Sequence, residues 1–225
     1  MSKQPPFLPG FYYHVYNRGN NGETLFRQER NYRYFLELYA LYIYQIAETF
    51  AYCLLPNHFH FLIRIRNLEG LPFQGRHSSD SHPPGTALLT SSGEQLYFPV
   101  EQRRSLNKIL SQQYATLFGT YTKAINKAFN RTGSLFEKPF HRKLVASDAY
   151  FTALIAYIHR NPQNHGIIDD YRDWPYSSYQ TLLSDKPSRL ERKTVLDWFD
   201  GAEGFKDIHR RDVDEKFIDE LLFDE

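Results

Sequence analysis

The feature that most constrains the fold is the apolar run LLPNHFHFLIRI at residues 54–65, in which two histidines flank one phenylalanine. Its β-branched and aromatic residues favour a strand, and side chains two positions apart on a strand point to the same face. His58 and His60 therefore project together, while Phe59 and Phe61 face the other side. Two neighbouring imidazoles form a two-nitrogen half-site for a divalent metal; the alternative is a pair of histidines on a solvated strand face.

The rest of the sequence alternates between strand-like and helix-like segments. Pro56-Asn57 breaks the run and predicts an antiparallel hairpin. Ser105 and Asp148 are suitable N-caps for helices. This order predicts an α+β fold, an antiparallel sheet with helices packed on it. The expected elements are strands at 11–16, 50–55 and 58–66, an extended segment at 134–145, and helices at 29–47, 105–129 and 149–160, the last closed by Pro162 and Gly166.

Residues 67–100 interrupt this pattern. They lack periodicity and are rich in Ser, Pro and Gly, which predicts an inserted, mobile and dispensable loop. His77 and His82 lie within it, but a metal site needs ligands on rigid elements, so neither is expected to bind metal.

A charged segment begins at Asp185. It has two weakly amphipathic pieces, near 192–199 and 213–223, which either pack on the domain or form a tail. We therefore expect one domain over residues 1–184, followed by a charged extension over 185–225.

The composition allows a nucleic-acid binder without requiring one. Aromatic residues make up 16% of the 225 residues, which suits sheet packing and also base stacking. The net charge is only +1, but residues 138–143 form a basic patch without an acid, and the tail after Asp212 is mostly acidic.

The same composition excludes several other classes. Cys53 is the one cysteine, so an internal disulfide is impossible. The sequence has neither an apolar N-terminal leader nor an apolar stretch of the roughly 20 residues that a membrane span needs. The expectation is a cytoplasmic protein that does not bind a membrane.

A tyrosine on the expected helix 149–160 could work with the two histidines. Asn161 follows Tyr157 by one turn, so the two share a helical face. If that face meets His58 and His60, the amide oxygen of Asn161 would be a third metal ligand. Mg²⁺ or Mn²⁺ suits this donor set, although two imidazoles would also accept Zn²⁺. The phenol could then attack a metal-polarised phosphorus.

The alternative is that Tyr157 is an interfacial aromatic residue and that Asn161 ends the helix before Pro162. Two other tyrosines, Tyr114 and Tyr121, are more easily explained as core residues. His159 lies off the apolar stripe and is expected to be exposed.

Four motifs in order resemble one family. They are LPNHFH at 55–60, GSLF at 133–136, YIHRNP at 157–162 and WPYSSY at 174–179. Together they resemble the single-tyrosine HUH transposases, and most closely the REP-associated tyrosine transposases. The resemblance runs from about Phe11 to Tyr179.

The resemblance implies a ferredoxin-like, RRM-like HUH fold and an enzyme that nicks and rejoins single-stranded DNA, often beside a hairpin. His58 and His60 match the metal histidines, Tyr157 the nucleophile, and Asn161 an additional metal ligand. The product would be a 5′-phosphotyrosine link and a free 3′-hydroxyl, formed without ATP. Some relatives act as homodimers that complete each other's sites, and others act alone.

The sequence departs from the family at the insertion 67–100 and after Ser184. A second hypothesis is therefore a sequence-specific DNA-binding module that kept the fold and lost cleavage. Either function would use basic residues as DNA contacts; the candidates are Arg64, Arg66, Lys138, Arg142 and Lys143.

Overall fold

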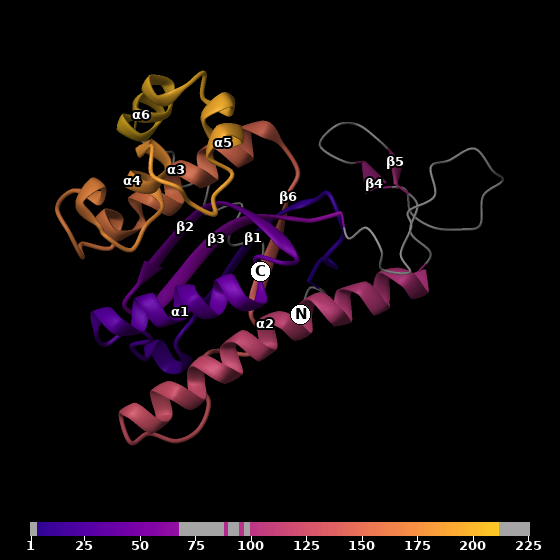
Figure 1. Ribbon diagram of the computed structural model, residues 1–225, viewed down its shortest axis with the longest axis vertical. Helices are drawn as coiled ribbons and strands as arrows, with labels where there is room; N and C mark the ends of the chain where they lie inside the picture. The colour runs from indigo at the N-terminus through magenta and orange to yellow at the C-terminus, as the bar shows by residue number, and fades with distance from the viewer. Residues whose placement is uncertain (1–3, 68–87, 90–94, 97–99, 212–225) are drawn as a thin grey trace.

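Four antiparallel strands form the centre of the structure, a computed structural model that describes residues 4–67, 88–89, 95–96 and 100–211. The strands lie in the order β2-β3-β1-β6, and each neighbouring pair is antiparallel. Two helices, α1 and α2, cover one face of this sheet, and α3 crosses the other (Figure 1). The predicted α+β fold is confirmed. The main elements are β1 (Tyr12–Arg18), α1 (Glu29–Tyr42), β2 (Ala47–Leu55), β3 (His58–Ile65), α2 (Val100–Ala128), β6 (His141–Val145) and α3 (Asp148–Asn164).

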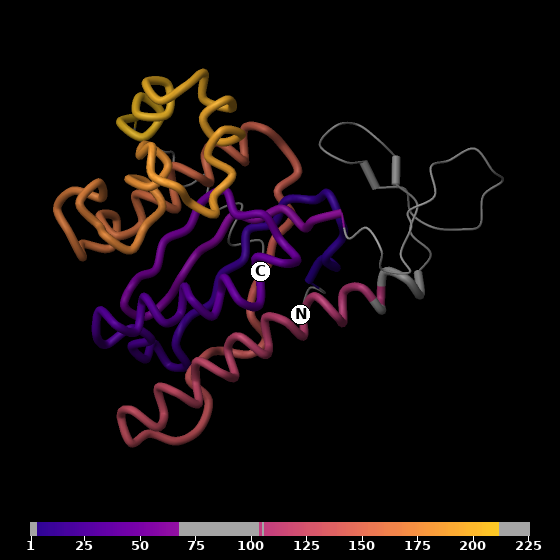
Figure 2. The backbone as a smooth tube through the Cα atoms, viewed as in Figure 1, coloured from indigo at the N-terminus to yellow at the C-terminus, as the bar shows by residue number. Residues whose placement is uncertain are grey.

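The smaller elements lie mostly after α3. They are η1 (Asn20–Gly22), β4 (Leu88–Leu89), β5 (Gln95–Leu96), η2 (Tyr171–Asp173), α4 (Tyr179–Leu183), α5 (Arg192–Trp198) and α6 (Ala202–Arg210). The backbone path in Figure 2 shows the segment from α3 to α6 gathered on one side of the sheet, opposite α1 and α2.

The hairpin between β2 and β3 fixes the start of the histidine strand. Pro56 and Asn57 form its two-residue turn. The Gly19 N–H donates to the Asn57 carbonyl at 2.7 Å, and the Leu25 N–H donates to the Pro56 carbonyl at the same distance. Because these bonds tie the turn to the segment after β1, His58 begins β3 at a defined position.

Strand alternation divides the apolar side chains between two cores. Phe59, Phe61 and Ile63 face α1 and α2, where they pack in the larger core. Leu62 faces α3 and belongs to the second core. His58 and His60 are in phase with Leu62, so they lie on the α3 side of the sheet.

The second core shows whether the segment after Asp185 packs on the domain or forms a tail. Val195 of α5 and Phe205 of α6 are completely buried in it, with α3 and α4. The segment after Asp185 therefore packs on the rest of the fold as far as α6. The amphipathic piece near 213–223 lies outside the described residues, and so does most of the predicted loop at 67–100, including His77 and His82.

Helix α3 differs from its prediction at both ends. Ser147, and not Asp148, is the N-cap, and its Oγ accepts the N–H of Tyr150 at 3.2 Å. Pro162 lies inside the helix instead of stopping it. The loss of one N–H is tolerated because the next turn remains bonded, with the His165 N–H donating to the Asn161 carbonyl at 3.0 Å.

Other boundaries moved for simple reasons. Helix α1 ends at Tyr42, before the predicted end at 47. The sequence pattern predicts the longer helix because apolar residues continue from α1 into β2. Helix α2 begins at Val100, before Ser105. Only the end of the extended segment 134–145 is a strand, because Pro139 has no N–H for a sheet ladder.

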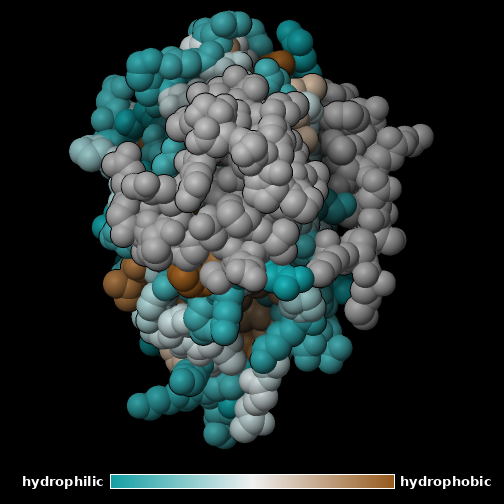
Figure 3. Space-filling view, turned by 90° about the vertical axis from the view of Figure 1, so that its right-hand side faces the viewer, coloured by the Kyte–Doolittle hydropathy of each residue, from teal (hydrophilic) through white to brown (hydrophobic). Residues whose placement is uncertain are grey.

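The described surface is mainly polar. Figure 3 shows one face on which hydrophilic colours predominate outside the grey regions. Among the described residues, the large apolar side chains that are exposed are Leu41, Ile109 and Ile167. No helix in the described ranges combines the length and the apolar character that crossing a membrane would require.

Candidate active site

An open cavity of about 810 Å³ lies where β1, β3 and β6 meet the C-terminal half of α3. Its lining differs from that of an ordinary surface hollow because several imidazole and phenol rings gather in it. These rings belong to Tyr16, His58, His60, His141, Tyr157 and His165. We refer to this cavity as the histidine groove.

His58 and His60 are neighbours in the groove, as their spacing on the strand predicts. Their ring centroids are 5.2 Å apart and their planes are nearly perpendicular, at 89°. The register with β1 places His60 opposite Tyr16 and His58 opposite Arg18. The sheet therefore fixes both backbone positions before any ligand is bound.

Two amide oxygens flank the ring of His58. Its Nδ1 lies 2.7 Å from Oδ1 of Asn57, and its Nε2 lies 3.0 Å from Oδ1 of Asn161. Burial lowers the pKa of His58 to about 4, partly opposed by the hydrogen bond to Asn161, while the neighbouring His165 and Arg18 act in the same direction as burial. The ring is therefore neutral at pH 7, which is the form that binds metals.

His60 has a different partner. Its Nδ1 lies 2.9 Å from Nε2 of His14, and both rings are buried. Burial, together with the neighbouring His14, His58 and His165, holds the pKa of His60 well below its usual value. Burial likewise lowers the pKa of His14 to about 3. Both rings are neutral, and Nδ1 of His14 is a buried atom without a hydrogen-bond partner.

Helix α3 brings the tyrosine and the asparagine to these histidines. The ring of Tyr157 lies 5.6 Å from the ring of His60, centroid to centroid, with an interplanar angle of 80°. Asn161, one turn later, is 1% exposed, and its Nδ2 is buried without a partner. Asn161 is inside the helix and turned towards His58, so it is not the helix stop of the alternative hypothesis. The four residues singled out in the sequence thus meet at one place.

The structure adds residues that the sequence did not reveal. His14 and Tyr16 reach the site from β1, and the cross-strand register that places them is not visible in the sequence. His165, at the end of α3, has its ring 4.9 Å from that of His58. The sequence predicts Asn57 only as a turn residue. The sequence feature that could have pointed to its contact with His58 is its position directly before this histidine.

One expectation about α3 was wrong. His159 is completely buried, because α4 and α6 cover the side of α3 that faces away from the sheet. Its Nδ1 lies 2.8 Å from Nε2 of His209, and its Nε2 lies 2.7 Å from Oγ of Ser178. His159 therefore joins α3 to α6 and to the segment before α4.

The core assignment of the other tyrosines is confirmed. Tyr114 and Tyr121 are buried on the α1 and α2 side of the sheet, in the larger core. The hydroxyl of Tyr121 donates to the Leu25 carbonyl at 2.9 Å. Neither hydroxyl lines the histidine groove.

The predicted basic contacts fall into two groups. Arg64 and Arg66 lie at the far end of β3 from His58 and form ion pairs with Glu48, at 2.5 and 3.3 Å. Lys143 pairs with His14 in the β1–β6 register, on the groove side, and Lys138 is exposed in the segment before β6.

Arg142 does not share the position of its neighbours. Its guanidinium is buried on the α2 side of the sheet, where it donates to the Pro5 carbonyl at 2.6 Å and to Oδ1 of Asn107 at 3.0 Å. It also lies over the ring of Phe7. Alternation along β6 places it on the opposite side of the sheet from Lys143, and its contacts tie β6 to Pro5 and to α2.

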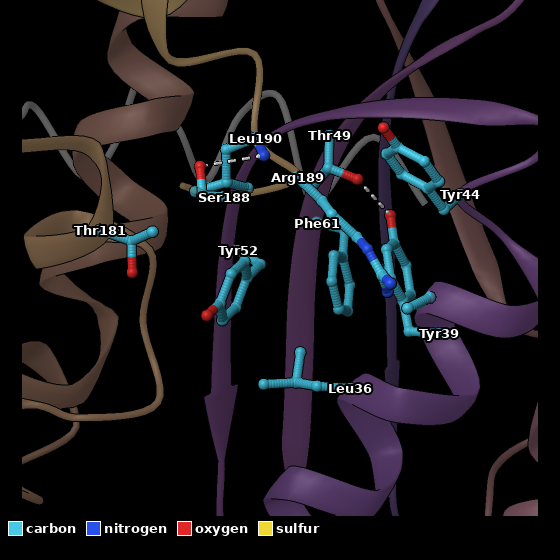
Figure 4. A pocket seen from close by; sticks show the side chains of 11 residues that line it. Leu36, Tyr39, Tyr44, Thr49, Tyr52, Phe61, Thr181, Ser188, Arg189 and Leu190 are labelled. Carbon is cyan, nitrogen blue, oxygen red and sulfur yellow. Dashed lines mark hydrogen bonds between the residues drawn. The ribbon is translucent and has the colours of Figure 1, made fainter. Parts of the chain in front are cut away.

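A second cavity, of about 250 Å³, lies on the opposite face of the sheet beside the edge strand β2 (Figure 4). Its lining is mainly apolar and aromatic, including Tyr39, Tyr52 and Phe61, with Arg189 across its mouth. The hydroxyls of Tyr39 and Thr49 bond to each other at 2.9 Å. Because no histidine or carboxylate lines it, the histidine groove is the better candidate for an active site.

The possible metal donors that meet beside Tyr157 are the imidazoles of His58 and His60 and the amide of Asn161. In the described part of the chain, no three side chains of His, Cys, Asp or Glu are placed to hold an ion together. Any site here would therefore depend on the oxygen of Asn161 as well as on His58 and His60.

Comparisons with known proteins agree with the resemblance seen in the motifs. No family model matches the chain. The chain is 26% identical over 133 residues to a Haemophilus influenzae protein described as "Putative REP-associated tyrosine transposase". This alignment covers 59% of the chain, and the chain spans 58% of the length of that relative.

A solved structure shares the fold. It is a REP-associated tyrosine transposase bound to a REP hairpin, with a TM-score of 0.51 and 15% sequence identity. The match covers 83% of this chain and 88% of the other. The fold is therefore that of these transposases, and the resemblance to the REP-associated tyrosine transposases is confirmed.

Proposed function

We propose that this chain, with the fold of the REP-associated tyrosine transposases and a groove that combines paired histidines with a tyrosine, cleaves and rejoins single-stranded DNA. The observation that supports this proposal most strongly is the meeting of Tyr157, His58, His60 and Asn161, which come from β3 and from a helix about a hundred residues later. The hydroxyl of Tyr157 would attack a phosphodiester, leaving a 5′-phosphotyrosine link and a free 3′-hydroxyl.

The donor atoms fit a divalent cation such as Mg²⁺ or Mn²⁺. Both imidazoles are neutral, as ligation requires. Oδ1 of Asn161 faces Nε2 of His58 at 3.0 Å, while the amide nitrogen of Asn161 has no partner. If Nε2 is unprotonated, two lone pairs face each other, an arrangement that a cation would stabilise. When bound, the cation would polarise a nonbridging phosphate oxygen and orient the scissile bond.

The chain's own residues would do the rest. Helix α3 holds Tyr157 beside His60, and the buried contacts of His159 hold α3 in place. The free phenol has a reference pKa of about 10, so it is a weak nucleophile at pH 7 and depends on a polarised phosphate. The sheet fixes the two histidines, which limits the reorganisation needed during the reaction.

The DNA partner we propose is a single strand next to a hairpin. The solved relative is bound to a REP hairpin. Lys138 follows Glu137, which lines the groove, and Lys143 lies opposite His14 on the groove side of β6, so we propose these two lysines as phosphate contacts. Arg64 and Arg66 are less suited to this role, because both already form ion pairs with Glu48. A homodimer, a domain boundary at 184 and a cytoplasmic location remain predictions from the sequence.

The second hypothesis is a DNA-binding module without cleavage. Such a module would not need the tyrosine, the two histidines and the asparagine to lie together. One experiment separates the two. A 3′-labelled single strand containing a hairpin is incubated with the protein and Mn²⁺, and covalent adducts are resolved on a denaturing gel, because the 5′-phosphotyrosine link retains the fragment that carries the 3′ end. The enzyme predicts an adduct that Tyr157→Phe abolishes and Tyr121→Phe retains. Hairpin binding without any adduct, across substrates and metals, would favour the binding module.

A further inference from the structure

Asn57 contacts the Nδ1 side of the His58 ring. Its Oδ1 lies 2.7 Å from Nδ1 of His58, while Oδ1 of Asn161 lies 3.0 Å from Nε2 of the same ring. A neutral imidazole has one N–H, and an amide oxygen can only accept. His58 therefore has one proton for two acceptors, and the position of this proton decides whether Nε2 can bind a metal.

The contacts favour Asn57 as the acceptor. Its distance to the ring is the shorter of the two, and the residues are adjacent in the chain, so little conformational entropy is lost in forming the bond. Asn161 has another option. Its Nδ2 is buried without a partner, so a turned amide could donate to an unprotonated Nε2.

The turn itself does not explain an asparagine at position 57. Among the described residues other than glycine, those with positive φ are Asn21, Asn130 and Asp200, so Asn57 does not occupy the left-handed region that favours asparagine. Asn57 is exposed, and the backbone carbonyl, which any residue supplies, makes the bond to Gly19. The contact that depends on its side chain is the one to His58.

We propose that Asn57 is a positioning residue that keeps Nδ1 of His58 protonated and so directs an unprotonated Nε2 towards Asn161 and the groove. This proposal rests on the metal site of the proposed function. The ring nitrogen of a metal-binding histidine that does not ligate usually donates to a carbonyl or carboxylate, which fixes the tautomer, and loss of such a partner typically weakens metal binding 10- to 100-fold.

His60 offers an internal comparison. Its Nδ1 faces another imidazole, His14, which can donate or accept. An amide oxygen can only accept, so it favours one tautomer of His58. His14 can do either, so it does not fix the tautomer of His60 in the same way. A change at Asn57 should alter the ring of His58 and leave the ring of His60 unchanged.

The first test uses the metal-free protein. Long-range ¹H–¹⁵N NMR spectra report the tautomer of each histidine in the parent, in Asn57→Asp and in Asn57→Leu. We expect the Nδ1–H form of His58 in the parent and in Asn57→Asp. In Asn57→Leu the proton should move to Nε2, where Asn161 accepts it. An Nε2–H form in the parent, or no change in Asn57→Leu, would overturn the proposal.

The second test measures Mn²⁺ binding by calorimetry. Asn57→Leu should raise the Kd about 10- to 100-fold, and Asn57→Asp should bind at least as tightly as the parent. Thermal unfolding, and an unchanged His60 signal, show that the variants are folded. If the parent binds no Mn²⁺ but the tautomers shift as expected, the metal site fails and the role of Asn57 stands. If the parent binds Mn²⁺ and Asn57→Leu binds equally well, the role of Asn57 fails.

Discussion

Acidification should destabilise the fold through His209, a buried residue of α6. Its Nδ1–H donates to the Phe205 carbonyl at 2.7 Å, and its Nε2 accepts from Nδ1 of His159 at 2.8 Å. Nε2 of His159 then accepts from the hydroxyl of Ser178. Each ring has one proton, and every ring nitrogen has a partner. A second proton on Nε2 of His209 would face the N–H of His159 and place two donors face to face in a buried site.

The size of the effect follows from the pKa. Burial lowers the pKa of His209 to about 4, although its bond to Phe205 acts in the opposite direction. An unfolded histidine titrates near 6.5, so the unfolded state binds more protons between pH 6.5 and pH 4. Stability is therefore fully present above about pH 6.5 and is lost as the pH falls. By linkage, His209 alone should cost about 2 kcal/mol at pH 5 relative to pH 7.

Urea unfolding at pH 7, 6 and 5 measures this cost in the parent and in His209→Gln. Glutamine retains an amide that can hydrogen-bond but does not titrate. His209→Gln is expected to be less stable than the parent at pH 7, with the difference shrinking by about 2 kcal/mol at pH 5. His14, His58 and His60 lie in the histidine site, away from His209, and should affect both proteins alike. Parallel loss of stability in the two proteins would refute the assignment.

Three further predictions concern packing and the proposed DNA contacts. Phe205→Ala should lower the free energy of unfolding by about 3–5 kcal/mol, because it empties a fully buried site in the second core; a loss below about 1 kcal/mol would show that α6 is dispensable. Arg142→Met should destabilise by about 1–3 kcal/mol because the Pro5 carbonyl loses its guanidinium donor and Oδ1 of Asn107 loses one of its donors, while hairpin-DNA affinity in a filter-binding assay stays near that of the parent. Lys143→Ala should weaken that affinity without loss of stability, and the reverse pattern would exchange the two roles.

The part of the site that could be predicted from the sequence is the part that depends only on the local periodicity of one strand and one helix. Two histidines at i and i+2 share a strand face, and Tyr157 and Asn161 at i and i+4 share a helix face, whatever the rest of the chain does. His14 could not be predicted in this way, because its place beside His60 depends on the register between β1 and β3. Cross-strand contacts of this kind are fixed by the whole sheet.

Two expectations differ from the structure, each for its own reason. Arg142 and Lys143 were placed in one basic patch, although adjacent residues on a strand face opposite sides of the sheet. His159 was assigned to solvent because the apolar stripe of α3 was expected to cover only one side. The charged segment after Asp185 folds over the other side, and its composition hid the few apolar residues that make this contact.

The most direct test of the account is to locate the covalent link. A protein–DNA adduct formed with a hairpin-flanked single strand and Mn²⁺ is digested with nuclease and protease, and the modified peptide is sequenced by tandem mass spectrometry. The account predicts a nucleotide phosphate on Tyr157, in the peptide that includes Asn161. A phosphate on Tyr16, the other tyrosine that lines the histidine groove, or on any other residue would contradict it.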